Sequence, residues 1–155
     1  MSKGNPDFSD FYRATFGPVS GAARAFCGNA DVAHESTQEA FAKAFARWPR
    51  LAQQQWAQAW VTTTALNLCR RRLRRRPPVA SDAQTVAGPT TDRIELLTAL
   101  RALPDRQRQA VVLHYLADCP VATVADLMGL SEGTVKSHLF KARAALRKSL
   151  EVRHA

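Results

Sequence analysis

The sequence predicts an all-α protein built from two small helical domains that are joined by an extended linker. Apolar residues recur at three- and four-residue spacing through most of the chain, which is typical of amphipathic helices. Strand signals are weak, because no hairpin dipeptide occurs and β-branched residues are few. One segment, PPVASDAQTVAGPTT, has no periodicity and is rich in Pro, Ser, Thr and Ala. We therefore expect domains over residues 8–76 and 92–150, with a linker over residues 77–91.

The first half of the chain predicts three long helices. An aromatic stripe that starts at Phe8 begins the first helix, and Gly17-Pro18 is expected to interrupt or kink it. Asp31 is the expected N-cap of the second helix, which should stop at Pro49. The third helix should start near Trp56 and continue into the arginine run. The predicted inner stripe of the second helix is Ala33, Ala40, Phe41, Ala44, Phe45 and Trp48.

The second half predicts further helices around two apolar stripes, with breaks at Pro104-Asp105 and at Asp118-Cys119-Pro120. The first stripe consists of Ile94, Leu97, Leu100 and Leu103. The second stripe consists of Val111, Val112, Tyr115 and Leu116.

The segment VATVADLMGLSEGTVKSHLFKAR predicts a helix-turn-helix. Gly129 supplies the left-handed conformation that ends its first helix, and Ser131 is the expected N-cap of the second. Val135 and Leu139 should then face the core, within a recognition helix from Glu132 to about Lys148. The residues left for DNA contact, at the helix N-terminus and on its outer face, are Ser131, Glu132, Gly133, Thr134, Lys136, Ser137, Lys141 and Arg143.

Specific base contacts are available to two of these side chains. A recognition helix contacts bases through its N-terminal residues and phosphates through cations and backbone amides. Glu132 can accept a hydrogen bond from cytosine N4, and Lys136 can donate one to guanine O6 or N7. The alternative is an ordinary helical hairpin with a solvated basic face, which the apolar pattern, the glycine and the cap together disfavour.

The charge distribution agrees with DNA binding. The formal net charge is +9, and two long tracts, residues 41–81 and 133–150, contain no acidic residue. Two separate basic tracts predict two anion-binding surfaces. The three cysteines, Cys27, Cys69 and Cys119, form no C-x-x-C pair and are expected to be free thiols. With no signal peptide and no bilayer-length apolar run, we expect a cytoplasmic protein without membrane insertion.

Both halves of the sequence resemble a known protein family. LRALPDRQRQAVVLHYLADCPVATVADLMGLSEGTVKSHLFKARAALRKSL resembles domain 4 of bacterial sigma factors of the extracytoplasmic-function (ECF) type, within the sigma-70 family. DVAHESTQEAFAKAFARW and AWVTTTALNLCRRRLRRR resemble two parts of sigma domain 2, the polymerase-binding helix and the helix that engages the −10 element. The resemblance covers about residues 8–76 and 92–150. Both domains in this order indicate the family more specifically than either domain alone.

The resemblance implies a function in transcription initiation. Domain 2 would bind the β′ clamp helices of core RNA polymerase and open the −10 region of promoter DNA. Domain 4 would bind the β flap and read the −35 element as duplex, and the linker would thread toward the RNA path. It implies no catalytic activity, no cofactor, no metal and no small-molecule substrate. Many members of the family are held by an anti-sigma factor, so such a partner is a further possibility.

Individual roles carry over where residues match the family pattern. The residues carried over to polymerase binding are Glu35, Gln38, Glu39 and Lys43. Those carried over to −10 contact are Gln53, Gln54, Gln55 and Trp56 around the loop that captures a flipped base, and Asn67, Arg70, Arg71 and Arg74 on the −10 helix. The chain departs from the pattern at Ser36 and Thr37, where the family usually has two apolar residues, and at His34, where an acid is common. The departure bears on the packing of this helix or on its contact with polymerase.

Several residues keep two interpretations. Trp48 and Trp60 fit core packing better than stacking on unpaired bases, whereas Trp56 fits both equally. The run from Arg70 to Arg76 fits phosphate contact better than a solvated helix end. Glu35 and Glu39 lie one turn apart and fit partner binding better than a solvated face.

Three rival functions are weaker. An enzyme is disfavoured because His34-Glu35 begins an H-E-x-x-H pattern in which Gln38 replaces the second histidine, and no phosphate-binding loop occurs. A stand-alone helix-turn-helix regulator with a sensor or dimerisation domain does not require the basic tract of the first half. A protein that sequesters another regulator would use its basic faces against an acidic partner, and its DNA binding would be absent even at low salt.

Overall fold

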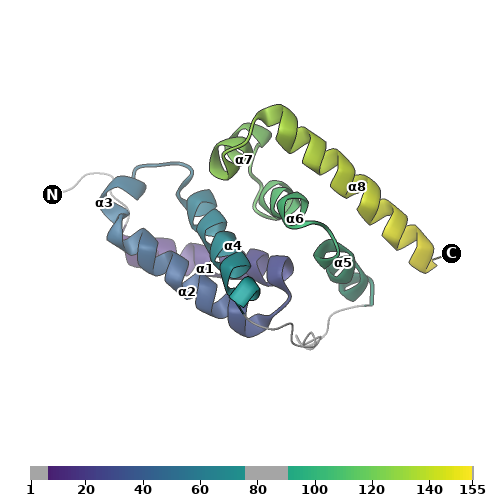
Figure 1. Cartoon of the computed structure of the whole chain (residues 1–155). Helices are drawn as coiled ribbons and strands as arrows, with labels where there is room; N and C mark the ends of the chain where they lie inside the picture. Colours follow the sequence, from purple (N-terminus) through teal and green to yellow (C-terminus); the bar gives the residue numbers. More distant parts are fainter. Residues whose placement is uncertain (1–6, 76–90, 155) are drawn as a thin grey trace.

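The computed structural model describes residues 7–75 and 91–154 of the chain (Figure 1). These residues contain helices and no β-strand, which confirms the all-α class. The elements are α1 (Phe8–Cys27), α2 (Ala30–Ala46), α3 (Trp48–Leu51), α4 (Ala57–Arg75), α5 (Thr91–Arg101), α6 (Asp105–Val111), the π-helical turn η1 (Val112–Leu116), α7 (Val121–Met128) and α8 (Glu132–His154). Residues 76–90, which include most of the expected linker, lie outside the described residues.

The N-terminal helical group consists of α1 to α4. Its three long helices, α1, α2 and α4, each pack against the other two. One buried cluster of this group contains Val19 of α1, Phe41 of α2, and Val61 and Leu68 of α4. The aromatic residues in the first half of α1, from Phe8 to Phe16, and Trp48 of α3 pack against the edge of this cluster. The cluster therefore fixes the orientation of α2 and α4, the two helices that carry predicted functional residues.

The first helix is continuous through Gly17-Pro18, so of the two expected outcomes, an interruption or a kink, the interruption is wrong. Pro18 lies inside α1, where it removes one backbone hydrogen bond at a cost of about 3 kcal/mol in an isolated helix. On both sides of it, Thr15 and Val19 are buried, as are Ala22, Ala23 and Phe26 further along the helix. Burial of this long apolar face outweighs the local defect.

The connection between α1 and α2 is a tight turn. Gly28 ends α1 in the left-handed conformation, with φ 69°, and its N–H donates to the Arg24 carbonyl at 2.9 Å. The N-cap of α2 is Asn29, whose side chain accepts from the Val32 N–H at 3.0 Å. The expected N-cap, Asp31, lies inside the first turn, where its negative charge still favours the helix dipole.

The end of α2 also differs from the prediction. The helix ends at Ala46, and Pro49 occupies the first turn of the short helix α3, a position where its missing N–H costs nothing. Phe45 was expected on the inner stripe but is 64% exposed. Its ring packs edge-on against Phe8, with centroids 5.1 Å apart, at the open end of α1 and α2.

The C-terminal helical group consists of α5, α6, η1, α7 and α8. Leu100 and Leu103 are buried as expected, whereas Ile94 is 44% exposed. The second predicted stripe is buried only at Val111 and Val112. The π-helical turn has more residues per turn than an α-helix, so the side chains that follow are rotated outward. Tyr115 and Leu116 are consequently exposed.

The helix-turn-helix is confirmed in its details. Gly129 ends α7 with φ 69°, and the Ser131 Oγ accepts from the Thr134 N–H at 3.1 Å as the N-cap of α8. Val135 and Leu139 are buried, with 0% and 3% exposure. The recognition helix is longer than expected, since α8 continues to His154.

The two groups pack against each other in Figure 1, where α8 lies on the far side of the C-terminal group. A single buried cluster joins Phe26, Leu66 and Cys69 to Leu113 and Val124. The Arg108 guanidinium stacks on the Phe26 ring at 4.5 Å. The sequence pointed to two modules that grip DNA at separate points, and it did not predict this shared interface.

Candidate nucleic-acid interface

The N-terminus of α8 presents a capped, exposed set of polar groups. Ser131 accepts from the Thr134 N–H and donates its hydroxyl hydrogen to the Thr134 Oγ1 at 2.9 Å. Val135 anchors the same turn in the core. The remaining N–H groups of the first turn point outward with the positive end of the helix dipole, which favours phosphate.

The outer face of α8 is open along its length. All eight residues predicted to contact DNA in this helix are exposed: Ser131, Glu132, Gly133, Thr134, Lys136, Ser137, Lys141 and Arg143. Arg143 is held in place by its Nη1, which donates to the Tyr115 hydroxyl oxygen at 2.7 Å. The structure therefore brings these residues to one accessible surface.

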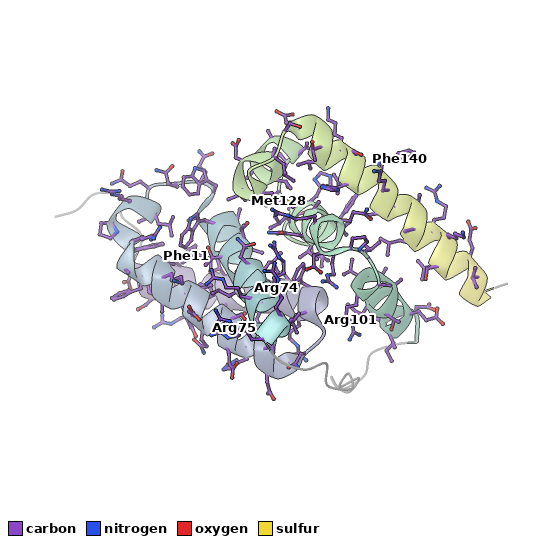
Figure 2. All side chains as sticks on the ribbon, in the orientation of Figure 1. Phe11, Arg74, Arg75, Arg101, Met128 and Phe140 are labelled. Atoms are coloured by element: carbon purple, nitrogen blue, oxygen red, sulfur yellow. The ribbon has the colours of Figure 1, made fainter. Side chains whose placement is uncertain are left out.

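Phe140 is a member of this face that sequence reasoning missed. It lies on α8 (Figure 2), is 69% exposed and follows Lys136 by one helical turn. An exposed aromatic ring between cations is suited to apolar contact with a thymine methyl group or a sugar. Its exposure could have been expected from its position in the helix, because Val135, Leu139 and Ala142 already fill the buried side.

The arginine-rich end of α4 forms a second basic surface (Figure 2). Arg71 and Arg74 are exposed. Asn67 and Arg70, by contrast, face the C-terminal group and are only half-exposed. The α4 residues predicted to contact the −10 element therefore divide into an accessible pair and a covered pair.

Gln109 of α6 covers the second pair. It is fully buried, accepts from the Arg70 Nη1 at 3.0 Å and donates to the Asn67 Oδ1 at 3.1 Å. Arg106 also approaches the Gln109 Oε1, at 3.5 Å. Burial lowers the pKa of Arg70, and the positive charges of Arg106 and Arg74 lower it further. The hydrogen bond to Gln109 thus holds the Arg70 guanidinium close to the positive charges of Arg106 and Arg74.

A polar cavity of about 330 Å³ lies at this contact. Its lining residues are Asn67, Arg70, Arg71, Arg74, Arg106, Gln109, Leu127 and Met128. Four of them are arginines and none is acidic, so the space carries a strongly positive potential.

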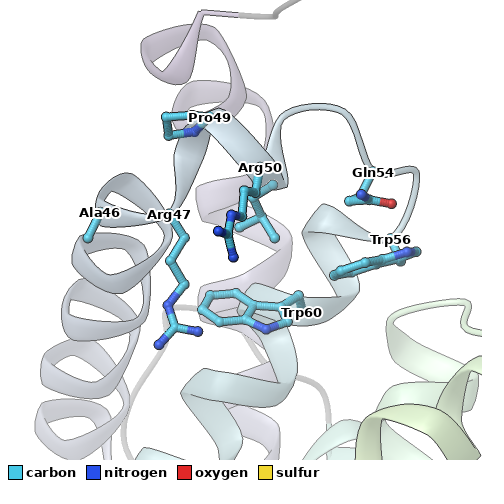
Figure 3. Close-up of a pocket in the computed structure, with 8 residues that line it drawn as sticks. Ala46, Arg47, Pro49, Arg50, Gln54, Trp56 and Trp60 are labelled. Atoms are coloured by element: carbon cyan, nitrogen blue, oxygen red, sulfur yellow. The ribbon is translucent and has the colours of Figure 1, made fainter.

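The loop before α4 borders a hollow of about 660 Å³ (Figure 3). Gln54 and Trp56 lie on one side of it and Arg47 on the other, with Trp60 and Arg50 between them. A mostly apolar concavity with aromatic rings, an amide and two cations has the groups needed to hold an unstacked base and its phosphate.

The three glutamines of the loop have different positions. Gln54 lines the hollow described above, whereas Gln55 lines a separate groove of about 340 Å³ together with Trp56 and Pro120 of the C-terminal group. Gln53 is exposed and borders neither space. Trp56 lines both the hollow and the groove.

Arg47 and Arg50 are further members of this site. Sequence reasoning counted them in the acid-free tract but gave them no role. The Arg47 guanidinium lies 5.5 Å from the centre of the Trp60 ring, a cation–π contact. The turn between α2 and α3, which the sequence did not predict, is what brings Arg47 to this position.

The tryptophans differ in their surroundings. Trp48 packs between Phe8 and Phe11, with ring centroids 5.3 Å and 4.8 Å away, in agreement with core packing. Trp60 is half-buried, with one edge in the core and one face toward the hollow. Trp56 is 42% exposed, so part of its ring is accessible, and both interpretations remain open for this residue.

The exposed side of α2 carries the residues predicted to bind polymerase. Gln38 accepts from the Tyr12 hydroxyl at 3.4 Å. Glu39 binds Arg72 of α4 at 2.6 Å and lies 3.9 Å from Lys43. Glu35 lies 3.8 Å from the Arg72 Nε. These carboxylates therefore also connect α2 to α4.

The departure from the family pattern at Ser36 and Thr37 concerns buried positions, because both residues are fully buried. The Ser36 hydroxyl accepts from the Arg72 Nη1 at 3.0 Å, so Arg72 compensates for its polarity. Within the described residues the Thr37 Oγ1 has no hydrogen-bond partner. The departure therefore falls on the packed side of the helix.

No cluster of His, Cys, Asp or Glu within residues 7–75 and 91–154 is arranged to hold a metal ion. Every helix there is too short or too polar to cross a lipid bilayer.

Comparison with known proteins gives two family matches in the expected order. The Sigma-70 region 2 family matches residues 11–77, and the Sigma-70 region 4 family matches residues 93–146. The first range contains α2, α3 and α4 and most of α1, and the second contains the helix-turn-helix.

Individual relatives agree. The chain is 32% identical over 129 residues to an RNA polymerase sigma-E factor of Streptomyces antibioticus, covering 78% of this chain and 72% of that one. It is 34% identical over 99 residues to the ECF RNA polymerase sigma factor SigM of Mycobacterium tuberculosis, covering 59% and 50%. The sigma factor RpoE of Bartonella quintana, solved with the anti-sigma factor NepR, shares the fold, with a TM-score of 0.82, 22% identity and coverage of 94% and 98%.

The fold and the matched regions define a transcription initiation factor of the sigma-70 family. The chain belongs to the ECF group of that family. It directs promoter-specific initiation by RNA polymerase, and promoter DNA and core polymerase are its partners.

Proposed function

We propose that the N-terminal unit, residues 8–76, binds the −10 element and that the C-terminal unit, residues 92–150, reads the −35 element, with residues 77–91 as the linker between them. The observation that carries this division is the pair of separate basic surfaces, one on α8 and one at the end of α4. A ligand with a continuous line of negative charge, such as promoter DNA, matches both surfaces at once.

At the −35 element, α8 enters the major groove of duplex DNA. Glu132 and Lys136 contact base edges, and the first-turn amides with Lys141 and Arg143 contact phosphates. The remaining contacts of this surface come from Ser131, Gly133, Thr134 and Ser137. Its exposure and the lack of any acid from residue 133 to 150 support this assignment.

At the −10 element, the contacts are with an opened strand. Trp56 and Gln54 receive an unstacked base in the hollow beside Trp60, and Arg71 and Arg74 contact the backbone that leads to it. Gln53, Gln55, Asn67 and Arg70 complete the surface. For Asn67 and Arg70 this requires that α6 move away, because both side chains are bound to Gln109.

The exposed side of α2 is the polymerase-binding surface, with Gln38 and Lys43 on its accessible part and Glu35 and Glu39 on the side shared with Arg72. The β′ clamp helices bind there, and the β flap binds the C-terminal unit. The chain has no catalytic activity of its own, and it acts in the cytoplasm, where its polymerase is. These assignments rest on the family and on the exposure of the residues.

An anti-sigma factor is a further partner in this proposal. Among solved structures of the same fold, the sigma factor RpoE was solved with the anti-sigma factor NepR, and CnrH was solved with the cytosolic domain of CnrY. The packed arrangement of the two helical groups agrees with a state in which the −10 surface is partly covered. A protein that stabilised this arrangement would inhibit the factor.

Run-off transcription tests the proposal. Core polymerase with and without the purified protein is given genomic fragments, and the transcripts are mapped. Discrete transcripts that require the protein support it, and their start sites define the promoter. If the protein bound a palindromic duplex as a dimer and failed to shift core polymerase, the chain would instead be a stand-alone regulator.

A further inference from the structure

The polar cavity between α4 and α6 is built by both helical groups. The N-terminal group contributes four residues of α4 to its lining, and the C-terminal group contributes two residues of α6 and two of α7. Arg74 and Met128, one from each group, are labelled in Figure 2. Separation of the groups would divide the walls of the cavity between them. A ligand held in this cavity therefore binds the packed arrangement and neither group alone.

The arginines of the cavity have no counter-ion in the described protein. They are Arg70, Arg71, Arg74 and Arg106. Within residues 7–75 and 91–154, none of them forms an ion pair with a carboxylate. The Asp105 carboxylate, which precedes Arg106 in the sequence, is bonded to Arg108 at 2.7 Å. Because like charges in a small space repel one another, an anion bound between the arginines would be stabilising.

Arg70 and Arg106 converge from the two groups. Their Nη1 atoms lie 3.0 Å and 3.5 Å from the same atom, the Gln109 Oε1. One neutral oxygen is a poor match for two guanidinium groups, each of which carries five N–H donors in a planar fork that fits phosphate oxygens. The geometry therefore places two groups suited to phosphate beside each other.

Arg70 is the least satisfied of these cations. Its Nε is buried and has no hydrogen-bond partner within the described residues. Burial lowers the pKa of Arg70, the positive charges of Arg106 and Arg74 lower it further, and Asp105 offsets these effects only in part. A negatively charged acceptor in the cavity would supply both the missing hydrogen bond and the missing charge.

The volume and the charge of the cavity limit the class of ligand. Its 330 Å³ lies at the lower end of the roughly 300–1,000 Å³ that is typical of ligand cavities, so it suits a compact group. A single phosphate is matched by one or two guanidinium groups. A chain of two or three phosphates has the charge and the length to meet arginines on both walls.

We propose that the cavity binds a linear oligophosphate, either a free inorganic chain or the phosphate tail of a nucleotide. Its phosphates bridge Arg106 of α6 to Arg70 and Arg74 of α4. Because the ligand binds only the packed arrangement, it shifts the protein toward that arrangement. The bound chain also keeps the α4 arginines from single-stranded DNA, and this consequence alone rests on the proposed −10 function.

Isothermal titration calorimetry of the full-length protein with inorganic triphosphate tests the site, at physiological ionic strength and without magnesium. We expect one site per chain, and weaker binding of inorganic phosphate. Arg106→Ala should weaken triphosphate binding by about tenfold, because it removes a charged hydrogen-bond donor. Arg106→Lys, which keeps the charge, should recover part of the affinity. Arg147→Ala is the matched control, since it removes an exposed cation of the same group outside the cavity and should leave the affinity unchanged.

A nucleoside triphosphate, titrated in the same way, distinguishes the two sources of the ligand. If it binds at least as tightly as inorganic triphosphate and loses affinity in Arg106→Ala, the site accepts the phosphate tail of a nucleotide. If it binds more weakly, the site prefers the free chain.

Fluorescence anisotropy with a single-stranded −10 oligonucleotide tests the consequence for DNA binding. Triphosphate at about ten times its Kd should weaken oligonucleotide binding to the wild type by up to about tenfold. It should have little effect on Arg106→Ala, which retains every arginine of α4. Equal inhibition of both proteins would show that the anion binds the α4 arginines alone, and the bridging site would be wrong.

Three calorimetric results would also overturn the site: no triphosphate binding, several equivalent sites, or the same loss of affinity in Arg106→Ala and Arg147→Ala. The last two would indicate general attraction of anions to a chain of net charge +9. Circular dichroism checks that each variant is folded, and Arg106→Lys provides a second variant at the same position. A protein that binds triphosphate as expected but binds no oligonucleotide would retain this site and lose the proposed −10 function.

Discussion

The recognition helix α8 and the −10 helix α4 differ in how much of their predicted DNA surface is available. Every predicted contact residue of α8 is exposed, and Val135, Leu139 and Ala142 are the residues buried on its inner side as far as residue 152. On α4, Arg71 and Arg74 are exposed while Asn67 and Arg70 are bound to Gln109. The difference teaches that the predicted surface of α8 is accessible as it stands, whereas half of the predicted surface of α4 is covered by the packing of the two helical groups.

The largest effect is expected from breaking the buried side of α8. Val135→Asp places a carboxylate in a fully buried site, which should reduce the free energy of unfolding by about 4 kcal/mol or more. Chemical denaturation followed by circular dichroism measures the loss. The control is Ser137→Asp on the exposed side, which should change stability by less than about 0.5 kcal/mol. Equal stability of the two variants would mean that α8 is not packed as described.

The exposed side of α8 is tested by Glu132→Ala and Lys136→Ala. Each removes a base contact that is worth about 1–3 kcal/mol, so each should weaken binding to a −35 duplex by roughly tenfold. Fluorescence anisotropy of the holoenzyme on labelled promoter DNA measures this, and core binding should stay intact. Lys148→Ala, further along the helix, is the matched control. Full activity of both variants at the native promoter would refute the assignment.

The accessible pair on α4, Arg71 and Arg74, is tested by the double variant Arg71→Ala with Arg74→Ala. Loss of two phosphate contacts should lower the dependence of log affinity on log salt by about 1.5 for single-stranded DNA. We expect less promoter opening, measured as reduced permanganate reactivity of the −10 thymines. Arg24→Ala, an exposed cation on α1, is the control. Unchanged thymine reactivity in the double variant would contradict the role of these arginines.

The same comparison explains what could be predicted from the sequence. The helix-turn-helix was predicted in detail because local rules determine it: Gly129 must adopt positive φ, Ser131 caps its own helix, and Val135 and Leu139 follow helical spacing. The cover over Asn67 could not be predicted, because Gln109 is distant in sequence and its burial depends on the packing of the two groups.

Local errors have similar causes. Pro18 was expected to interrupt α1, but burial of the surrounding apolar face outweighs its local cost. Tyr115 was placed on a buried stripe because helical spacing assumes a regular α-helix, and the π-turn η1 breaks that spacing. Arg47 was not assigned to the base-binding hollow, because the turn after α2 that positions it depends on Pro49 starting a new helix.

Removal of the cover over α4 should have a smaller effect. Gln109→Ala deletes the acceptor for Arg70 and the donor to Asn67, which should weaken the contact between the groups by about 1 kcal/mol. The free protein should then bind a single-stranded −10 oligonucleotide up to about fivefold more tightly. Anisotropy measures the affinity, and thermal melting checks the fold. Gln107→Ala on the same helix is the matched control; equal affinity of both variants with the wild type would show that Gln109 does not restrain α4.

The smallest effect concerns the packing beneath the polymerase-facing side of α2. The Thr37 Oγ1 is buried and has no hydrogen-bond partner within the described residues, so the hydroxyl carries a desolvation cost without compensation. Thr37→Val keeps the shape of the side chain and should raise the free energy of unfolding by about 1 kcal/mol. Thr62→Val is the matched control, because the buried Thr62 hydroxyl donates to the Gln58 carbonyl at 2.8 Å and its loss should give no gain. Since neither change alters the exposed surface of α2, core polymerase should bind both variants with wild-type affinity. A stabilised Thr37→Val variant with normal polymerase binding would show that the departure at this position costs stability alone, whereas weakened polymerase binding would show that the packing of α2 also determines its contact surface.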